Sequence, residues 1–258
     1  MLIEEQIKKR VVGFGNGSIV YTPKSWIGRE VIIALPKLSL KEEVLDLLKP
    51  YLENIQGIYL YGSYARGEQE QDSDIDVLVI SDKRFSLEKK GYDINVRSLE
   101  NLKKILIENP VYSLIFKEAK TVLNKSLLDN LKKIKLPISK PNFSFILDTT
   151  KDVLEINKQL IDIEDDSFDN VAVIYSLVLR LRGLYMVDCV LKNRLYSNKD
   201  FKKFVIKKGI NDFDLLYDIY RCIRDNKRIR KANISKDSIT KLYILVKNET
   251  KKKNAQIN

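Results

Sequence analysis

Residues 62–80 read Gly62-Ser63-Tyr64-Ala65-Arg66-Gly67-Glu68-Gln69-Glu70-Gln71-Asp72-Ser73-Asp74-Ile75-Asp76-Val77-Leu78-Val79-Ile80. An apolar-rich run of strand length, residues 55–61, comes directly before this stretch, and residues 77–80 form a second such run at its end. Runs of this length and composition predict two β-strands. The polar segment between them therefore carries Gly-Ser after the first strand and Asp-x-Asp at the start of the second.

The two acids of this segment, Asp74 and Asp76, are two positions apart, so on a strand they project from the same face. Like charges held that close are unfavourable unless they are neutralised, and a hard divalent cation such as Mg²⁺ or Mn²⁺ does so through oxygen ligands. Gly62 leaves the backbone free of a Cβ, and Ser63 adds a hydroxyl and backbone N–H groups for phosphate oxygens. A metal site beside a phosphate site predicts nucleotide chemistry.

This stretch resembles the signature of the nucleotidyltransferase superfamily that includes polymerase β, kanamycin nucleotidyltransferase and the minimal nucleotidyltransferases. The family pattern is Gly-Ser, a spacer and Asp-x-Asp; the spacer here, residues 64–73, has the family's length, and the family's Ala-Arg-Gly is present at residues 65–67. In the alternative interpretation, Gly62 is a turn glycine and the two acids are solvated. That alternative must attribute the matching spacing of both halves to chance.

The resemblance implies a set of site residues. Asp74 and Asp76 would bind two Mg²⁺ ions, Gly62 and Ser63 would hold the β- and γ-phosphates, and Arg66 would offset their charge. The reaction implied is transfer of a nucleoside monophosphate from an NTP, with ATP as the expected donor, to a hydroxyl group. The acceptor stays open between a protein tyrosine, an RNA end and a small alcohol.

Family members carry a third acid on a neighbouring strand, and Asp93 is the candidate here. Residues 92–97 alternate apolar and polar side chains between Gly91 and Ser98, which predicts a third strand with Asp93 on its polar face. Asp93 would complete the second metal site and assist deprotonation of the acceptor. The alternative is a solvated acid on a strand.

The composition of the chain limits which partners and which kinds of catalytic site it can have. The 258 residues carry a formal net charge of +11, which indicates either a polyanionic partner or a lysine-rich solvated surface. The absence of histidine excludes His-ligated zinc, His general bases and Ser-His-Asp triads.

Cys189 and Cys222 are isolated, as in a reducing cytosol. No apolar run is long enough to cross a membrane and no signal-peptide pattern is present, so we expect a soluble cytoplasmic protein.

Residues 1–37 are expected to form a separate β module. A glycine-rich turn at residues 13–18, strands at residues 19–22 and 30–35, and a helical turn at residues 23–28 are predicted. With Gly15-Asn16 and Pro23-Lys24-Ser25-Trp26-Ile27-Gly28, the module resembles the AbrB-type swapped hairpin. The resemblance implies a homodimer and DNA binding, although a dense basic cluster is missing. The alternative is a hairpin that only packs on the next domain.

Two further domains are predicted, a catalytic core at residues 38–140 and a helical bundle at residues 141–258. The bundle resembles the C-terminal domain of kanamycin nucleotidyltransferase and the HEPN bundle; without histidine, no ribonuclease activity is implied. One of its helices, predicted from about residue 168 to 195, carries a polar cluster that is either a buried ion-pair network or a contact to acceptor or triphosphate. Its members are Arg180, Arg182, Tyr185 and Asp188. Lysines 251–253 are expected to be a solvated end.

The overall prediction is an α/β (α+β) protein with a small mixed sheet flanked by helices, acting as a Mg²⁺-dependent nucleotidyltransferase. The rival prediction is a DNA-binding regulator or antitoxin-like protein in which the transferase fold is inactive or senses a ligand. Retention of Asp74 and Asp76 counts against the rival, because an inactive site has no physical need for two adjacent acids.

Overall fold

The computed structural model describes residues 5–7, 9–34, 38–162, 170–228 and 234–257. The chain divides into two compact units, Met1–Glu43 and Val44–Asn258. The predicted boundary at residue 37 lies in an undescribed segment, and the further division at residue 140 falls inside the second unit. The three-domain division therefore stays a prediction.

The first unit contains a short antiparallel hairpin. Strands β1 (Val12–Phe14) and β2 (Gly17–Ile19) pair through Val12 and Ile19, and the turn between them uses Gly15 at a φ of +54°. A 3₁₀ turn, η1 (Lys24–Trp26), follows. The predicted glycine-rich turn and helical turn are thus present, whereas the two short strands that flank the glycine-rich turn were not predicted.

The strands predicted at residues 19–22 and 30–35 are wrong in their placement. Only Ile19 lies in a strand, and residues 30–34 are irregular, while Leu35 lies outside the described residues. Val31, Ile32 and Ile33 have the composition of a strand but are exposed by 47%, 73% and 75%. A strand needs a partner for its backbone groups, and the described part of this chain provides none for residues 30–34.

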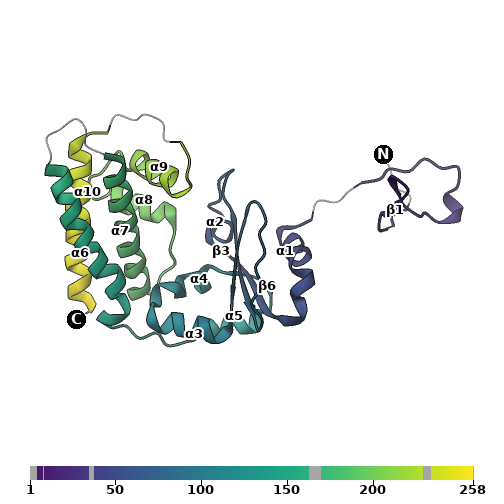
Figure 1. Cartoon of the computed structure of the whole chain (residues 1–258), viewed down its shortest axis with the longest axis horizontal. Helices are drawn as coiled ribbons and strands as arrows, with labels where there is room; N and C mark the ends of the chain where they lie inside the picture. The colour runs from purple at the N-terminus through teal and green to yellow at the C-terminus, as the bar shows by residue number, and fades with distance from the viewer. Residues whose placement is uncertain (1–4, 8, 35–37, 163–169, 229–233, 258) are drawn as a thin grey trace. The chain divides into compact units, whose positions relative to one another are not determined.

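The core of the second unit is a mixed sheet, as predicted (Figure 1). Its strands are β3 (Ile55–Tyr61), β4 (Ile75–Ser81), β5 (Tyr92–Arg97) and β6 (Lys120–Leu123), in the order β5-β4-β3-β6. β3 is antiparallel to β4 and β6, whereas β4 and β5 are parallel. The connection from β4 to β5 contains no helix.

Short helices precede and follow the strands of this sheet. They are α1 (Leu40–Leu48), η2 (Lys49–Asn54), α2 (Gly62–Arg66), α3 (Leu99–Glu108), η3 (Pro110–Tyr112), α4 (Ser113–Glu118) and α5 (Lys125–Lys132). At the start of α1, Glu42 N–H donates to Ser39 Oγ at 3.4 Å and Ser39 N–H donates to Glu42 Oε2 at 2.8 Å, which is a reciprocal cap. Tyr59, Leu78 and Ile80 of the sheet pack on Leu102, Leu106 and Leu128 of the helices.

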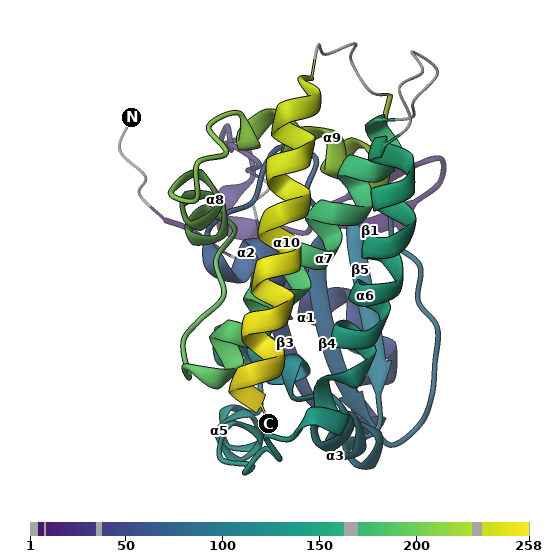
Figure 2. The ribbon, with the colours of Figure 1, turned by 90° about the vertical axis from the view of Figure 1, so that its left-hand side faces the viewer.

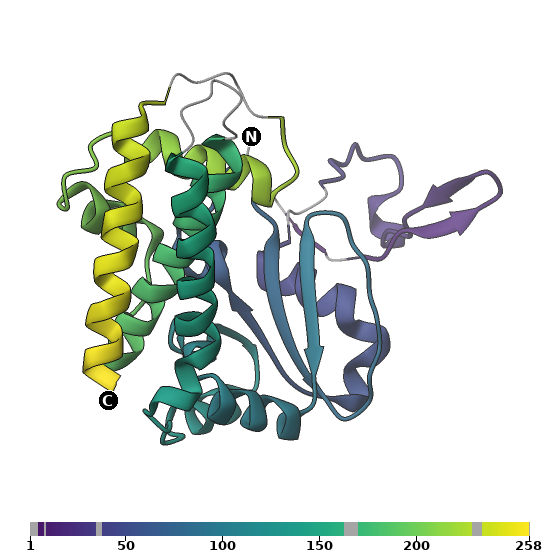
Figure 3. The same cartoon turned by 60° about the vertical axis from the view of Figure 1, so that its left-hand side comes forward.

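The rest of the second unit is helical: α6 (Lys140–Asp162), α7 (Asn170–Leu191), α8 (Asn198–Ile206), α9 (Phe213–Arg224) and α10 (Lys236–Ile257). The long helices α6, α7 and α10 lie side by side (Figures 2 and 3). Helix α6 begins at Lys140, so Pro141 lies in its first turn. Proline is compatible with a first helical turn, where its missing N–H has no helical acceptor.

The solvated end predicted for lysines 251–253 is wrong for Lys253. α10 continues through these residues, and the side chain of Lys253 is only 1% exposed and forms an ion pair with Asp188 of α7. Its position on the face of α10 that packs on α7 decides its environment, and a buried ammonium requires such a partner. The other buried charges of this helix include Glu249.

Cys189 and Cys222 are free thiols, as predicted. None of the helices in the described part of the chain is both long and apolar enough to span a bilayer.

Candidate active site

The predicted site residues meet at one end of the sheet, where β3 ends and β4 and β5 begin; this end is called the sheet edge below. β3 ends at Tyr61, which pairs with Asp76 of β4, and Asp76 is in turn the register partner of Asp93 on β5. A cavity of about 960 Å³ opens at this edge. All six predicted residues line it: Gly62, Ser63, Arg66, Asp74, Asp76 and Asp93.

Two features of position 62 require glycine: its backbone conformation and the closeness of Asp76. Its φ is +71°, in the left-handed region that side chains other than glycine rarely adopt. A Cβ at this position would lie 1.9 Å from Asp76 Oδ2. The glycine of the motif therefore lets the turn after β3 approach the carboxylate of Asp76.

The carboxylate of Asp76 lies in an environment that disfavours its negative charge. Burial raises its pKa to about 6, and the charge of Asp93 adds to the rise, while Arg66 acts against it. The pKa of Tyr61 is also raised, by burial and then by the charges of Asp76 and Asp93. Both shifts have the sign expected where negative charge accumulates at the sheet edge.

The donor set at this edge suits a hard cation. No group of three or more acidic or cysteine side chains in the described part of the chain is placed to hold a metal ion by itself. Mg²⁺ commonly binds one or two carboxylates together with substrate phosphates and water. Asp76 and its neighbours therefore fit a metal site that the nucleotide completes, and the arrangement of three carboxylates with Asp93 stays a prediction.

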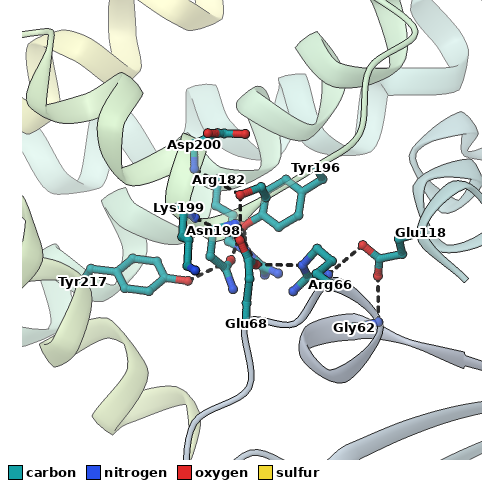
Figure 4. A network of polar contacts seen from close by, with 11 residues as sticks. Gly62, Arg66, Glu68, Glu118, Arg182, Tyr196, Asn198, Lys199, Asp200 and Tyr217 are labelled. Atoms are coloured by element: carbon teal, nitrogen blue, oxygen red, sulfur yellow. Dashed lines mark hydrogen bonds and ion pairs between the residues drawn. The ribbon is translucent and has the colours of Figure 1, made fainter. Parts of the chain in front are cut away.

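Arg66 is engaged by two carboxylates (Figure 4). Its Nη1 donates to Glu118 Oε2 at 2.7 Å and its Nε donates to Glu68 Oε2 at 2.9 Å. The backbone N–H of Gly62 also donates to Glu118, at 2.7 Å from Oε1. Two groups that the motif offers to phosphate are thus held by one carboxylate of α4.

The opposite wall of the cavity comes from the bundle and is basic. Its cations are Arg182, Lys199, Lys202, Arg221, Arg224 and Lys227. Arg221 pairs with Glu70, and Lys227 pairs with Asp72 at 3.2 Å. Arg182 instead donates to the hydroxyl of Tyr196 at 2.8 Å, and among the described residues it has no carboxylate within ion-pair distance.

The polar cluster predicted on α7 separates into two parts. Arg182 faces the cavity, whereas Arg180 donates to Thr149 Oγ1 at 2.9 Å inside the bundle. Asp188 pairs with Lys192, Arg194 and the buried Lys253, and the guanidinium of Arg194 lies over the ring of Tyr185. Ion pairing within the bundle therefore accounts for Asp188, and only Arg182 reaches the site.

Sequence reasoning missed Glu68, Glu118, Tyr196 and Arg221. Glu118 carries no spacing signal, because it lies 52 residues from Arg66 in the chain. Glu68 lies in the spacer of the motif, where its contact with the start of α8 could not be predicted. The basic residues of α9 could have been noticed as a pair, Arg221 and Arg224, at helical spacing. Their direction toward the sheet edge depends on packing that the sequence does not show.

A family model described as "Polymerase beta, Nucleotidyltransferase" matches residues 42–136. Among curated proteins, the chain is similar to one from Methanocaldococcus jannaschii named "Putative protein adenylyltransferase", with 32% identity over 71 residues that cover 28% of this chain and 69% of that protein. A second protein of that organism with the same description is 45% identical over 47 residues, which cover 18% of this chain and 47% of that protein.

Two solved structures are also similar. A spectinomycin adenyltransferase from Enterococcus faecialis, solved with ATP and spectinomycin, has 14% sequence identity and a TM-score of 0.39, and the match covers 81% of this chain and 97% of that one. A nucleotidyltransferase-like protein from Exiguobacterium sibiricum has 15% identity and a TM-score of 0.37, covering 84% of this chain and 77% of that one.

Proposed function

The chain belongs to the polymerase β-type nucleotidyltransferase family, and on that basis we propose that it is a Mg²⁺-dependent enzyme that transfers a nucleoside monophosphate from ATP to a hydroxyl group. The observation that carries the proposal is the meeting of Gly62, Asp76 and Asp93 at one cavity. The relatives named as protein adenylyltransferases support a protein hydroxyl as the acceptor.

The roles proposed for the carboxylates follow from their positions. Asp74 and Asp76 would hold Mg²⁺ together with phosphate oxygens, and Asp93, on the neighbouring strand, would join them and accept the proton of the acceptor hydroxyl. Bound divalent cations would neutralise charge on the triphosphate and polarise its oxygens. A divalent cation would fit this site for an electrostatic reason, because the negative charge of Asp93 disfavours that of Asp76 in the protein without a cation.

The phosphate contacts would come from both walls. Ser63 supplies a hydroxyl at the sheet edge, and Arg182 and Lys199 supply positive charge from the bundle. Arg182 has no acidic partner in the described part of the chain, so an anionic ligand would compensate a charge that tyrosine hydroxyls only solvate. This half-buried guanidinium would therefore contact the polyphosphate.

The chemical step would need little more than positioning. The acceptor oxygen would form a bond to the α-phosphorus while the bond from that phosphorus to the bridging oxygen of the β-phosphate breaks, and pyrophosphate leaves. The acceptor proton would pass to Asp93. The basic wall would stabilise the charge that develops on the leaving pyrophosphate.

The test uses the two acids of the Asp-x-Asp pattern. In an Asp74→Asn/Asp76→Asn variant, the rate of pyrophosphate release should fall by more than about a hundredfold, or about 3 kcal/mol of barrier, because the cation loses its ligands. ATP should bind far more tightly with Mg²⁺ than with EDTA in the unmodified protein, and calorimetry should show no such difference in the variant.

Asp46→Asn serves as the matched control, since Asp46 is an exposed acid of α1 that does not line the cavity. Equal metal-dependent ATP binding by the unmodified protein and the double variant would reject the assignment. Salt-dependent binding to duplex DNA without pyrophosphate release would instead favour the regulator interpretation, which no observation on the site supports.

A further inference from the structure

A chain of polar contacts connects the Gly62 turn to the bundle (Figure 4). Glu118 accepts from Gly62 N–H and from Arg66, and Arg66 donates to Glu68. The Glu68 carboxylate then accepts from Ser197 Oγ at 2.6 Å, from Asn198 N–H at 3.1 Å and from Lys199 N–H at 3.3 Å, all at the start of α8. The contacts cross from the sheet edge to the basic wall.

The three charged groups of this chain are largely removed from water. The side chains of Arg66, Glu68 and Glu118 are exposed by 13%, 7% and 8%. Burial raises the pKa of Glu118 against the pull of Arg66. Burial acts in the same direction on Glu68, but the hydrogen bonds from Ser197 and Arg66 outweigh it and hold its pKa below the usual range.

We propose that Glu118, Arg66 and Glu68 are positioning residues that form a bridge and set the placement of the basic wall relative to the metal-binding acids. The proposal rests on the proposed function, because it assigns these residues to the same transfer reaction. One end of the bridge is Gly62, whose backbone lies against Asp76. The other end is α8, whose residues Asn198, Lys199 and Lys202 line the cavity.

The geometry favours a role for Arg66 as a permanent link between Glu118 and Glu68. The alternative role is a phosphate-binding residue that leaves these carboxylates when the nucleotide binds. Arg66 is held on two sides by carboxylates, a forked arrangement that lysine cannot reproduce. Moving Arg66 to a phosphate would leave Glu118 and Glu68 buried without their shared cation, and uncompensated buried charge is strongly unfavourable. The Gly62 N–H would lose its acceptor at the same time.

The kinetic test compares Glu118→Gln with Glu108→Gln, the control, which changes an exposed glutamate of α3 that pairs with Lys104 and does not line the cavity. A misplaced wall should lower kcat for pyrophosphate release by about tenfold to a hundredfold, with KM for ATP changed by less than about threefold. Arg66→Lys should behave like Glu118→Gln. Tighter ATP binding in Glu118→Gln would overturn the proposal by showing that Glu118 keeps Arg66 from a phosphate. Full activity in Arg66→Lys would overturn it by showing that the two-sided contact of Arg66 is not needed.

A second measurement requires no catalysis. Among the described residues, the hydrogen bonds and ion pair of Glu118 go to Gly62 and Arg66 and not to α8. In Glu118→Gln the amide hydrogens of Asn198 and Lys199 should nevertheless exchange with solvent at least about tenfold faster, because Arg66 is then held by a carboxylate on one side only and orients Glu68 less firmly. Unchanged exchange at both amides would overturn the bridge. If the unmodified protein releases no pyrophosphate, the proposed function fails, and the exchange rates alone decide whether the bridge exists.

Glu68→Gln provides the reverse experiment and covers the case in which Glu118→Gln does not fold. Its neutral side chain can still accept from Ser197, so helix α8 keeps part of its cap. Here the amide of Gly62, at the far end of the bridge, should exchange faster than in the Glu108→Gln control. A Gly62 amide that exchanges at the control rate would contradict coupling between the two ends.

Discussion

Gly62 and Gly67 provide a comparison at the scale of single residues. Both have left-handed backbones, with φ of +71° and +69°, but a Cβ on Gly62 would meet Asp76 whereas one on Gly67 would meet nothing within 4 Å. Both Gly→Ala changes should therefore cost about 1 kcal/mol of unfolding free energy for the backbone. Only Gly62→Ala should also displace Asp76 and abolish metal-dependent ATP binding, measured by calorimetry beside urea unfolding. Equal ATP binding by the two variants would contradict this role of Gly62.

The residues of the site differ in how far the sequence could predict them. Gly62, Ser63, Asp74 and Asp76 were predicted from one continuous segment, where spacing alone brings them together. Asp93 required a strand prediction, and its register partner Asp76 confirms that the two strands place these acids side by side. Glu118 could not be predicted, because its role depends on α4 packing beside β3, a contact between distant segments.

At the scale of helices and strands, the pairing of α7 with α10 through Asp188 and Lys253 should make stability depend on pH. Burial opposes the charge of Asp188, but its bonds to Lys253 and Lys192 outweigh this and lower its pKa. A lowered folded-state pKa gives stability that is present above the unfolded value, about 4, and is lost as pH falls through the folded value. Asp188→Asn should thus cost more unfolding free energy at pH 7 than at pH 3.

Urea unfolding at the two pH values measures this difference. Lys253→Met should be destabilising by about 2 kcal/mol or more at pH 7, since it leaves a largely buried carboxylate with only its outer partners Lys192 and Arg194. Lys158→Met, which removes an exposed i,i+4 pair with Asp162, is the control and should change stability by about 0.5 kcal/mol or less. A similar loss of unfolding free energy in Lys253→Met and Lys158→Met would show that the buried ion pair stabilises the protein no more than an exposed one.

The strands show which sequence patterns are sufficient to predict a strand. β3, β4 and β5 were predicted because each is an apolar or alternating run bounded by glycine or polar residues. β6 was missed, since Lys120–Leu123 is only four residues long and two of them are polar. Residues 30–34 show the converse, because strand propensity without a pairing partner gives no strand.

At the scale of the whole molecule, the first unit lacks a core of its own. No described residue before Val44 is buried, and Val12, Phe14, Tyr21, Ile27 and Ile32 are exposed by 46% to 82%. A module of this size needs additional apolar contacts to be stable. We therefore expect a homodimer formed through residues 1–37, as the AbrB-like pattern implies, and deletion of these residues should give a monomer by light scattering. A full-length protein that is monomeric at high micromolar concentration would contradict the prediction.

The bond from Asn198 to Glu68 joins residues 130 positions apart in the chain. Contacts of such separation form late in folding, because a long loop must close before they contribute any stability. The sheet can acquire its hydrogen bonds while the ribosome is still adding the bundle, but the two walls of the cavity cannot yet face each other. Newly made protein should therefore gain nucleotide affinity only after synthesis passes α8. In refolding experiments, ATP binding should return later than the protection of the β3 and β4 amides from hydrogen exchange, and simultaneous recovery would show that the sheet edge alone is sufficient.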